Sequence, residues 1–415
     1  MLRTNLQRVT AKRVSILWFA LAVILTHSAQ AQTYTVLHNF TGGDNGGGPL
    51  AGVTLDAGGN LYGTTQAGGY TEGGECSHGG CGTVYRLKHA GSGWTLSSLY
   101  SFHDNDGNLP YARVVFGPDG TLFGTTNEGG YQENGVVFNL RPPSTVCKSV
   151  LCPWTETVLH EFTGNSDGCL PYFGDLTFDA AGHLYGTTAD CGEALGTVFE
   201  LARQPSGGWL ESILYDVDRD GAGEYPFNSV IFDTQGNLYT TTEFSIDEYG
   251  TVIQMVNSPS GWTGTDLHVF SGGSDGGALY GGLVFDPAGN LYGNTFIGGE
   301  YNGGTVFELS PSNGGWVFNV IYNFTGLGPW ASMVVDAAGN LYGTTTGSGA
   351  FGDGNVFKLS PSDDGWTYSS LHDFTGGSDG GFPVSVVSFD ANGNLYGTAS
   401  QGGSNGKGVV WEITP

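Results

Sequence analysis

The chain has 415 residues, and its 13 Lys and Arg stand against 39 Asp and Glu, which gives a formal net charge of −26. A surface this negative repels nucleic acid and anionic lipid, so we exclude both as partners. Net charge says more about solubility outside the cell than about the chemistry of any site.

Residues 1–31 are predicted to be an export signal. Four basic residues between Arg3 and Arg13 precede the apolar run 14–25, and Ala29-Gln30-Ala31 has the small-x-small form of a cleavage site. A membrane-spanning helix needs roughly 20 apolar residues, and neither this run nor any later segment reaches that length. We therefore expect a soluble, secreted protein, extracellular or periplasmic, that begins at Gln32 after cleavage and has no membrane span.

One four-part unit then repeats along the chain. A segment that closes with LHxF is followed by an apolar run usually ending in Asp, by the string GNLYGTT, and, after a Gly-rich stretch, by an apolar segment such as GTVFEL. The string GNLYGTT and its variants begin at Gly59, Gly120, Gly182, Gly236, Gly289, Gly339 and Gly393. All four segments are short, rich in Val, Phe, Tyr and Thr, and bounded by turn residues, which is typical of β-strands joined by tight turns.

These seven units predict an all-β fold, a seven-bladed β-propeller of four-stranded antiparallel blades spanning 32–415 as a single domain. We name the strands of a blade A (the run ending in Asp), B (LYGTT), C (TVFEL) and D (closing with LHxF). The Asp that ends strand A, such as Asp56, is expected to cap its own turn and to be structural.

The two ends of the chain complement each other. The sequence after the predicted signal opens with a lone D strand at 34–40 and finishes with a lone C strand at 408–414. Because an open array would leave strand edges at both ends, we expect the first strand to pair with the last blade and to close the ring.

The unit LHxFxGGxDGxxPxxxLxxDxxGNLYGTTxxGGxxGxGTVFxLSP resembles the GloVer tandem repeat of the "choice-of-anchor" exported bacterial proteins, over essentially all of the chain after residue 31. That resemblance implies a β-propeller-like exported bacterial protein of unassigned activity, and it supplies no catalytic residues. Some relatives end in a sorting anchor, whereas this chain stops at 411–415 directly after its last strand. We therefore expect it to be freely secreted and monomeric.

Six cysteines in an exported chain favour disulfides, although sequence alone allows 15 pairings. Cys76 with Cys81, and Cys147 with Cys152, would each close a very short loop. Cys169 lies in a D-to-A loop and Cys191 in the B-to-C loop of the same blade, so the propeller makes them neighbours. A metal site is the competing interpretation, but paired C-x-x-C spacing is missing.

In a propeller the D-to-A and B-to-C loops emerge on one face, around the mouth of the central channel. Here those loops are long and variable, which makes that face our candidate for binding. The residue after the Pro that enters strand A is often aromatic, and these side chains could stack on a sugar. We favour packing between blades as their role. They are Tyr111, Tyr172, Phe227, Tyr280 and Trp330.

Two residues of the inner strands, Arg113 and Asp175, break a pattern of small or apolar neighbours. If both point into the channel, they form either an ion pair between neighbouring blades, which we favour, or the polar floor of a pocket. Four histidines, His38, His160, His268 and His372, share one repeat position on outer D strands and are interpreted as structural.

Calcium is the one cofactor that the sequence suggests; the alternative is that the protein has none. Asp216, Asp218 and Asp220 have the D-x-D-x-D-G spacing that arranges carboxylates around a hard cation. No distal Glu completes a standard loop, so ordinary turn chemistry is the favoured interpretation.

The leading functional hypothesis is a secreted, non-enzymatic binding propeller that holds an extracellular carbohydrate or protein on the loop-rich face. The alternatives are a propeller enzyme, a polysaccharide lyase or glycoside hydrolase using acidic residues of that face, and a structural surface spacer. A pair of loop carboxylates with raised pKa beside the aromatic ring would favour the enzyme.

Overall fold

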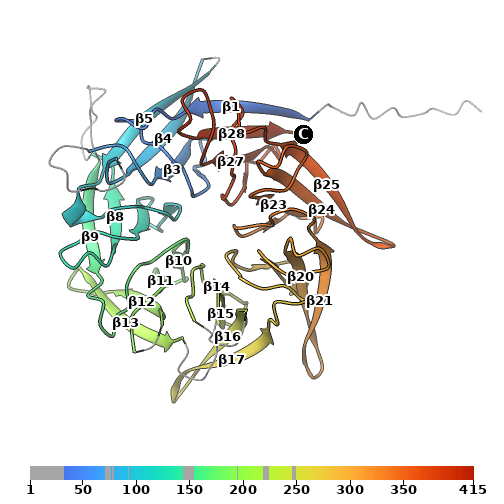
Figure 1. Cartoon of the computed structure of the whole chain (residues 1–415). Helices are drawn as coiled ribbons and strands as arrows, with labels where there is room; N and C mark the ends of the chain where they lie inside the picture. The colour runs from blue at the N-terminus through green and yellow to red at the C-terminus, as the bar shows by residue number, and fades with distance from the viewer. Residues whose placement is uncertain are drawn as a thin grey trace, which may run out of the picture. The chain divides into compact units, whose positions relative to one another are not determined.

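The computed structural model describes residues 32–70, 76, 79–91, 93–143, 154–193, 195–217, 224–244 and 249–415. Residues Gln32–Pro415 form one compact unit. In the described residues this unit is all-β, with 28 strands in seven four-stranded antiparallel sheets and a single 3-10 turn, η1 (Asp104–Asp106). The sheets are arranged in a ring (Figure 1), which confirms the predicted seven-bladed propeller.

Each blade runs from an inner strand A to an outer strand D. The A strands are β2 (Thr54–Leu55), β6 (Val115–Phe116), β10 (Thr177–Phe178), β14 (Ile231–Phe232), β18 (Val284–Phe285), β22 (Val334–Val335) and β26 (Ser388–Phe389). The B strands are β3 (Leu61–Thr65), β7 (Leu122–Thr126), β11 (Leu184–Thr188), β15 (Leu238–Thr242), β19 (Leu291–Thr295), β23 (Leu341–Thr345) and β27 (Leu395–Ala399). The C strands are β4 (Thr83–Ala90), β8 (Val136–Arg141), β12 (Thr197–Arg203), β16 (Thr251–Ser258), β20 (Thr305–Ser312), β24 (Asn355–Ser362) and β28 (Val409–Thr414). The D strands are β5 (Gly93–Ser101), β9 (Thr155–Glu161), β13 (Trp209–Asp216), β17 (Gly261–Val269), β21 (Gly315–Asn323), β25 (Gly365–Asp373) and β1 (Thr33–Asn39).

Burial follows the place of each strand in the blade. Every B strand is buried at all five positions, which suits its run of Leu, Tyr, Gly and Thr. The D strands alternate between exposed and half-buried residues because one face packs on a neighbouring blade and the other faces solvent.

The A-to-B turns are built by the Asp that ends strand A. Asp56 Oδ1 accepts hydrogen bonds from the backbone N–H of Gly58 at 2.8 Å and of Asn60 at 2.9 Å, while its Oδ2 accepts one from the Asn60 side chain at 2.7 Å. Gly59 has a φ of 75°, a conformation that favours glycine. Bonds of this kind recur at Asp233, Asp286, Asp336 and Asp390, which confirms the structural role predicted for this Asp.

The ring closes through the two ends of the chain. Strand β1 pairs antiparallel with β28, with Tyr34 opposite Ile413 and Asn39 opposite Val409, and completes the sheet β1-β28-β27-β26. Figure 1 shows the blue first strand alongside the red last one. The expected closure is confirmed.

The hydrophobic core is divided among the contacts between neighbouring blades. At the closing contact, Phe40 and Val410 of the last blade pack with Tyr85 and Leu87 of the first. An internal contact has the same composition, with Phe270 and Val252 packed on Phe307 and Leu309. Each blade is therefore stabilised by its neighbours, and the closing contact is built like the others.

Disulfides link Cys76 to Cys81 and Cys169 to Cys191, as predicted. The predicted pair of Cys147 and Cys152 lies outside the described residues. In the described part of the chain, no helix is long and apolar enough to cross a lipid bilayer.

Candidate functional site

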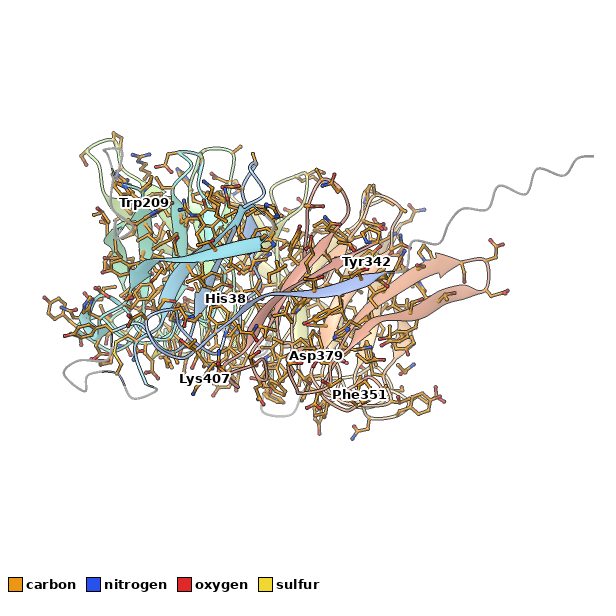
Figure 2. All side chains as sticks on the ribbon, turned by 90° about the horizontal axis from the view of Figure 1, so that it is seen from above. His38, Trp209, Tyr342, Phe351, Asp379 and Lys407 are labelled. Atoms are coloured by element: carbon orange, nitrogen blue, oxygen red, sulfur yellow. A yellow bond between two sulfur atoms is a disulfide. The ribbon has the colours of Figure 1, made fainter. Side chains whose placement is uncertain are left out.

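The variable loops of each blade meet on one face of the ring. The D-to-A and B-to-C loops are joined by short antiparallel bridges, for example Cys169 with Asp190 and Gly277 with Ile297. Figure 2 shows loop residues Asp379, Lys407 and Phe351 on one side and Trp209, at the start of a D strand, toward the other. The D-to-A and B-to-C loops therefore lie on one face of the ring, as the repeat predicts.

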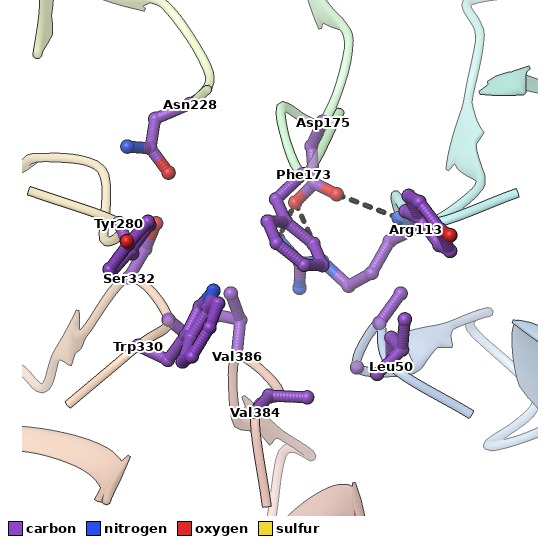
Figure 3. A pocket seen from close by; sticks show the side chains of 14 residues that line it. Leu50, Arg113, Phe173, Asp175, Asn228, Tyr280, Trp330, Ser332, Val384 and Val386 are labelled. Carbon is purple, nitrogen blue, oxygen red and sulfur yellow. Dashed lines mark hydrogen bonds and ion pairs between the residues drawn. The ribbon is translucent and has the colours of Figure 1, made fainter. Parts of the chain in front are cut away.

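A pocket lies at the axis of the ring, where the segments that enter the A strands converge. Its cavity volume is about 20 Å³, and Figure 3 shows its side chains reaching inward from separate blades. The side chains leave room for only about one water molecule in this pocket. A larger ligand would therefore bind at the mouth and not thread through the channel.

The predicted aromatic residues form a continuous arc around this mouth. The ring centroids of Tyr111 and Tyr172 lie 5.0 Å apart, those of Tyr172 and Phe227 4.9 Å, and those of Phe227 and Tyr280 6.2 Å. Tyr280 then stacks on Trp330 at 4.4 Å with an interplanar angle of 17°. The rings thus pack against one another from blade to blade, the role favoured from the sequence, and Tyr111, Tyr280 and Trp330 also line the pocket.

The strand register corrects one member of this set. Phe173 precedes strand β10 by the same number of residues as Tyr111 precedes β6 and Trp330 precedes β22, because one extra residue, Tyr172, lies between Pro171 and the strand. Phe173 lines the pocket, with its ring 5.8 Å from Tyr111 and 6.3 Å from Trp330. Counting from the proline selected Tyr172 and missed Phe173, which is the residue that lines the pocket in the third blade (β10–β13).

Arg113 and Asp175 occupy one repeat position on neighbouring blades and meet at the wall of the pocket. Arg113 Nε donates to Asp175 Oδ2 at 2.7 Å, and the Arg113 backbone N–H donates to Oδ1 at 2.9 Å. Arg113 also donates to Ser388 Oγ at 3.2 Å, which ties it to a third blade. The ion pair favoured from the sequence is present. Because both residues line the pocket, the pocket wall is polar at this point.

The aromatic arc around this mouth also carries hydrogen-bonding groups. Burial raises the pKa of Tyr111 to about 12 and also raises the pKa of Tyr172 and of Tyr280, so all three hydroxyls stay protonated at neutral pH. The indole N–H of Trp330 is buried and has no hydrogen-bond partner among the described residues. An unpartnered buried donor is uncommon and calls for an explanation.

Glu243 is a second residue of this site that the sequence interpretation missed. It follows strand β15 directly, only 6% of its surface is exposed, and its carboxylate accepts a hydrogen bond from Tyr280. Burial raises the pKa of Glu243 to about 7. The available signal was its position, since the residues that follow the other B strands are Gln66, Asn127, Ala189, Phe296, Thr346 and Ser400.

The outer part of this face carries exposed aromatic side chains. Tyr131, Tyr249, Tyr301 and Phe351 lie on B-to-C loops and are between 42% and 82% exposed. Exposed aromatic residues on one face are typical of surfaces that contact partners.

The calcium prediction cannot be placed, because Asp218 and Asp220 lie outside the described residues. Asp216 ends strand β13 and accepts a long hydrogen bond, 3.4 Å, from the Glu193 N–H. The four repeated histidines lie on outer strands, as expected. Three of them pair with the loop Asp seven residues later, for example His268 with Asp275 at 3.2 Å and His372 with Asp379 at 3.1 Å, whereas His38 contacts Asn45.

Comparison with known proteins identifies the repeat. No curated protein matches the chain. Among solved structures, a gluconolactonase from Xanthomonas campestris is 16% identical, with a TM-score of 0.41 over 72% of this chain and 84% of its own. A protein from Bacteroides uniformis assigned as a 6-phosphogluconolactonase is also 16% identical, with a TM-score of 0.48 over 80% of this chain and 87% of its own. At these scores neither likeness carries an argument about activity.

The model of the Gloeobacter/Verrucomicrobia repeat matches residues 22–156, 151–331 and 325–415, which together cover the whole propeller. This chain therefore belongs to the Gloeobacter/Verrucomicrobia repeat family.

Proposed function

We propose that this protein is a secreted binding propeller that holds a neutral carbohydrate on its loop-rich face, at the mouth of the central channel. The observation that carries the proposal is the arc of aromatic rings from Tyr111 to Trp330 beside a buried, unpartnered indole N–H. A sugar offers both surfaces that such an arc fits: apolar C–H faces that stack on aromatic rings and hydroxyls that accept or donate hydrogen bonds.

The charges at the mouth favour a neutral ligand over an anionic one. The cation of Arg113 is already neutralised by Asp175, and Glu243 and Glu128 lie close enough to the tyrosines to influence them electrostatically. A free anion would meet these acidic groups with no unpaired Arg or Lys lining the pocket in the described residues. The cavity itself has a volume of only about 20 Å³, so the terminal sugar of a glycan would lie on the aromatic arc at the mouth and not inside the pocket.

Export is part of the same proposal. The predicted signal at 1–31 and the two disulfides suit an oxidising compartment, extracellular or periplasmic, where a glycan-binding protein would meet its ligand.

A glycan array probed with the full chain after residue 31 tests the proposal, with and without calcium. We expect binding to neutral glycans that falls at least about tenfold in Trp330→Ala, because losing a stacked indole removes on the order of 1.4 kcal/mol. Leu210→Ala, an exposed apolar residue of outer strand β13, is the matched control and should bind like the parent protein. Binding unaffected by Trp330→Ala, or no glycan binding at all, would overturn the proposal.

The enzyme alternative is favoured by one specific observation, the raised pKa of Glu243 beside Tyr280. A carboxyl group that is still protonated near neutral pH is suited to act as a general acid on a glycosidic oxygen. Product analysis of the bound glycans separates the two functions. Turnover that is lost in Glu243→Gln, while binding is kept, supports the enzyme, and binding without products supports the lectin-like role.

A further inference from the structure

The outer strands of neighbouring blades share a stacking position that is filled by aromatic rings at three contacts. A His or Tyr near the end of one D strand lies flat against a ring on the D strand of the next blade. The centroid distances are 3.7 Å for His268 with Phe318, 4.8 Å for Tyr322 with Tyr368 and 3.6 Å for His372 with Tyr34. These three pairs provide an internal reference for the same position elsewhere in the ring.

Between blades 2 and 3 the aromatic partner is replaced by a glutamate. Glu211 is opposite Leu201 in its blade, just as Phe318 is opposite Leu309, so the two occupy the same register. His160 is the histidine that faces it. Its Nε2 lies 3.5 Å from Glu211 Oε1 and 3.5 Å from Asp167 Oδ2, and all three side chains are largely buried.

The three donor atoms converge and are poorly satisfied within the protein. His160 Nε2 and Glu211 Oε1 are buried, and their contacts of 3.5 Å are longer than well-formed hydrogen bonds. Asp167 is held in place from behind, since its Oδ1 and Oδ2 accept hydrogen bonds from the hydroxyl and backbone N–H of Thr163 at 2.6 and 2.8 Å. In the ion pairs of the described residues, the two carboxylates are matched only by His160.

This donor set and its spacing match a divalent transition-metal ion. One atom from each residue can be chosen so that all three lie within 4.8 Å of one another. Tetrahedral coordination with bonds of about 2.0–2.2 Å separates neighbouring ligand atoms by about 3.3–3.6 Å, and both separations from Nε2 are 3.5 Å. An imidazole with two carboxylates suits Zn²⁺, whereas calcium takes oxygen ligands.

We propose that His160 Nε2, Asp167 Oδ2 and Glu211 Oε1 bind one Zn²⁺ ion on the outer wall of the propeller. The ion joins strand β9 of blade 2 and the loop that follows it to strand β13 of blade 3, and a water molecule completes the tetrahedron. It supplies the positive charge that two buried carboxylates otherwise lack, and it replaces the aromatic stack of the other contacts as the link between these blades.

Titration of the untagged, chelator-treated protein with Zn²⁺, followed by calorimetry and thermal melting, tests the site. We expect one Zn²⁺ per chain and a higher melting temperature. Glu211→Phe rebuilds the stack seen at His268, so it should fold and melt normally without zinc while losing zinc binding. His160→Gln should also lose the site. Calcium is titrated in parallel, and its binding, if any, should be unchanged by Glu211→Phe.

The matched gain-of-function variant is Phe318→Glu, which places a carboxylate opposite His268 and Asp275. The proposal predicts that its zinc stoichiometry rises from one to two. The proposal is overturned if the parent protein binds no Zn²⁺ at micromolar concentrations, or if Glu211→Phe and His160→Gln bind it as the parent does.

Discussion

Truncation of Phe40 tests whether the ring is closed in solution. Phe40 follows strand β1, has no exposed surface, and its ring centroid lies 5.2 Å from that of Tyr85 in the first blade. Its N–H donates to the Gly408 carbonyl at 3.0 Å. Phe270 is the matched internal residue: it is 1% exposed, lies 5.1 Å from Phe307, and donates to Gly250 at 2.9 Å.

Replacing a fully buried Phe with Ala costs about 3–5 kcal/mol in transfer free energy and cavity formation. Because the two sites have the same burial and the same kind of neighbours, Phe40→Ala and Phe270→Ala should lower the free energy of unfolding by similar amounts. Urea denaturation followed by tryptophan fluorescence measures both. If Phe40→Ala costs less than about 0.5 kcal/mol, as an exposed residue would, while Phe270→Ala costs the full amount, the first strand is not docked and the closure is wrong.

Three further predictions concern the mouth and its supports. Burial raises the pKa of Glu243 from 4.5 to about 7, so the folded state retains a proton that the unfolded state has lost. The free energy of unfolding should therefore fall by up to about 3 kcal/mol as pH rises from 4.5 to above 7. The urea midpoints of Glu243→Gln should lack this component of the pH dependence. The Cys169–Cys191 disulfide spans 22 residues, so the double change Cys169→Ser and Cys191→Ser should cost roughly 3 kcal/mol in the same assay, and an unchanged midpoint would show that the loop is constrained without it. A Cβ at Gly52 would collide with the Val386 carbonyl of the last blade, so Gly52→Ala should cost about 1–3 kcal/mol, whereas Gly93→Ala, with open space around it, should be neutral in thermal melting.

The architecture was predictable because nearly the same sequence pattern of turns and strands repeats in every blade. The Gly of the A-to-B turn and the buried LYGTT-type strand recur in all seven blades, and the Asp that ends strand A recurs in all but the second, where Gly117 replaces it, so local turn chemistry and hydrophobic burial agree. Closure followed from the single D strand at the start of the propeller and the last blade that lacks one. Even the Cys169–Cys191 disulfide could be inferred, since the fold brings together two loops that the sequence separates.

The ring position of blade 3 could not be read from the sequence in the same way. Pro171 marks the entry of the segment, but the position of a side chain around the axis is set by strand pairing, with Thr177 opposite Tyr185 and Phe178 opposite Leu184. One extra residue between the proline and the strand shifts which aromatic faces the channel. Counting residues from the proline therefore predicts Tyr172 as the aromatic residue that faces the channel, whereas the hydrogen-bonded strand register identifies Phe173.

The properties of Glu243 depend on contacts from other blades. Its raised pKa comes from burial, and its hydrogen bond comes from Tyr280 of the next blade. Neither is encoded in the residues beside it. The sequence does show an acidic residue where the other blades have amides, hydroxyls or apolar groups. That difference is the only sequence signal for a special role of Glu243.

A repeat of this kind gives a general way to separate scaffold from site. Residues that recur in all blades form the turns, the strand pairing and the packing between neighbouring blades. They therefore explain the ring but no function specific to one place in it. A function that needs one location must instead use positions where a single blade departs from the pattern. Arg113, Asp175 and Glu243 are such departures, and each is at least half-buried against a neighbouring blade. Burying a polar side chain in place of a small or aromatic one is unfavourable unless it is compensated. The ion pair provides that compensation for the first two, and for Glu243 a bound ligand would provide it.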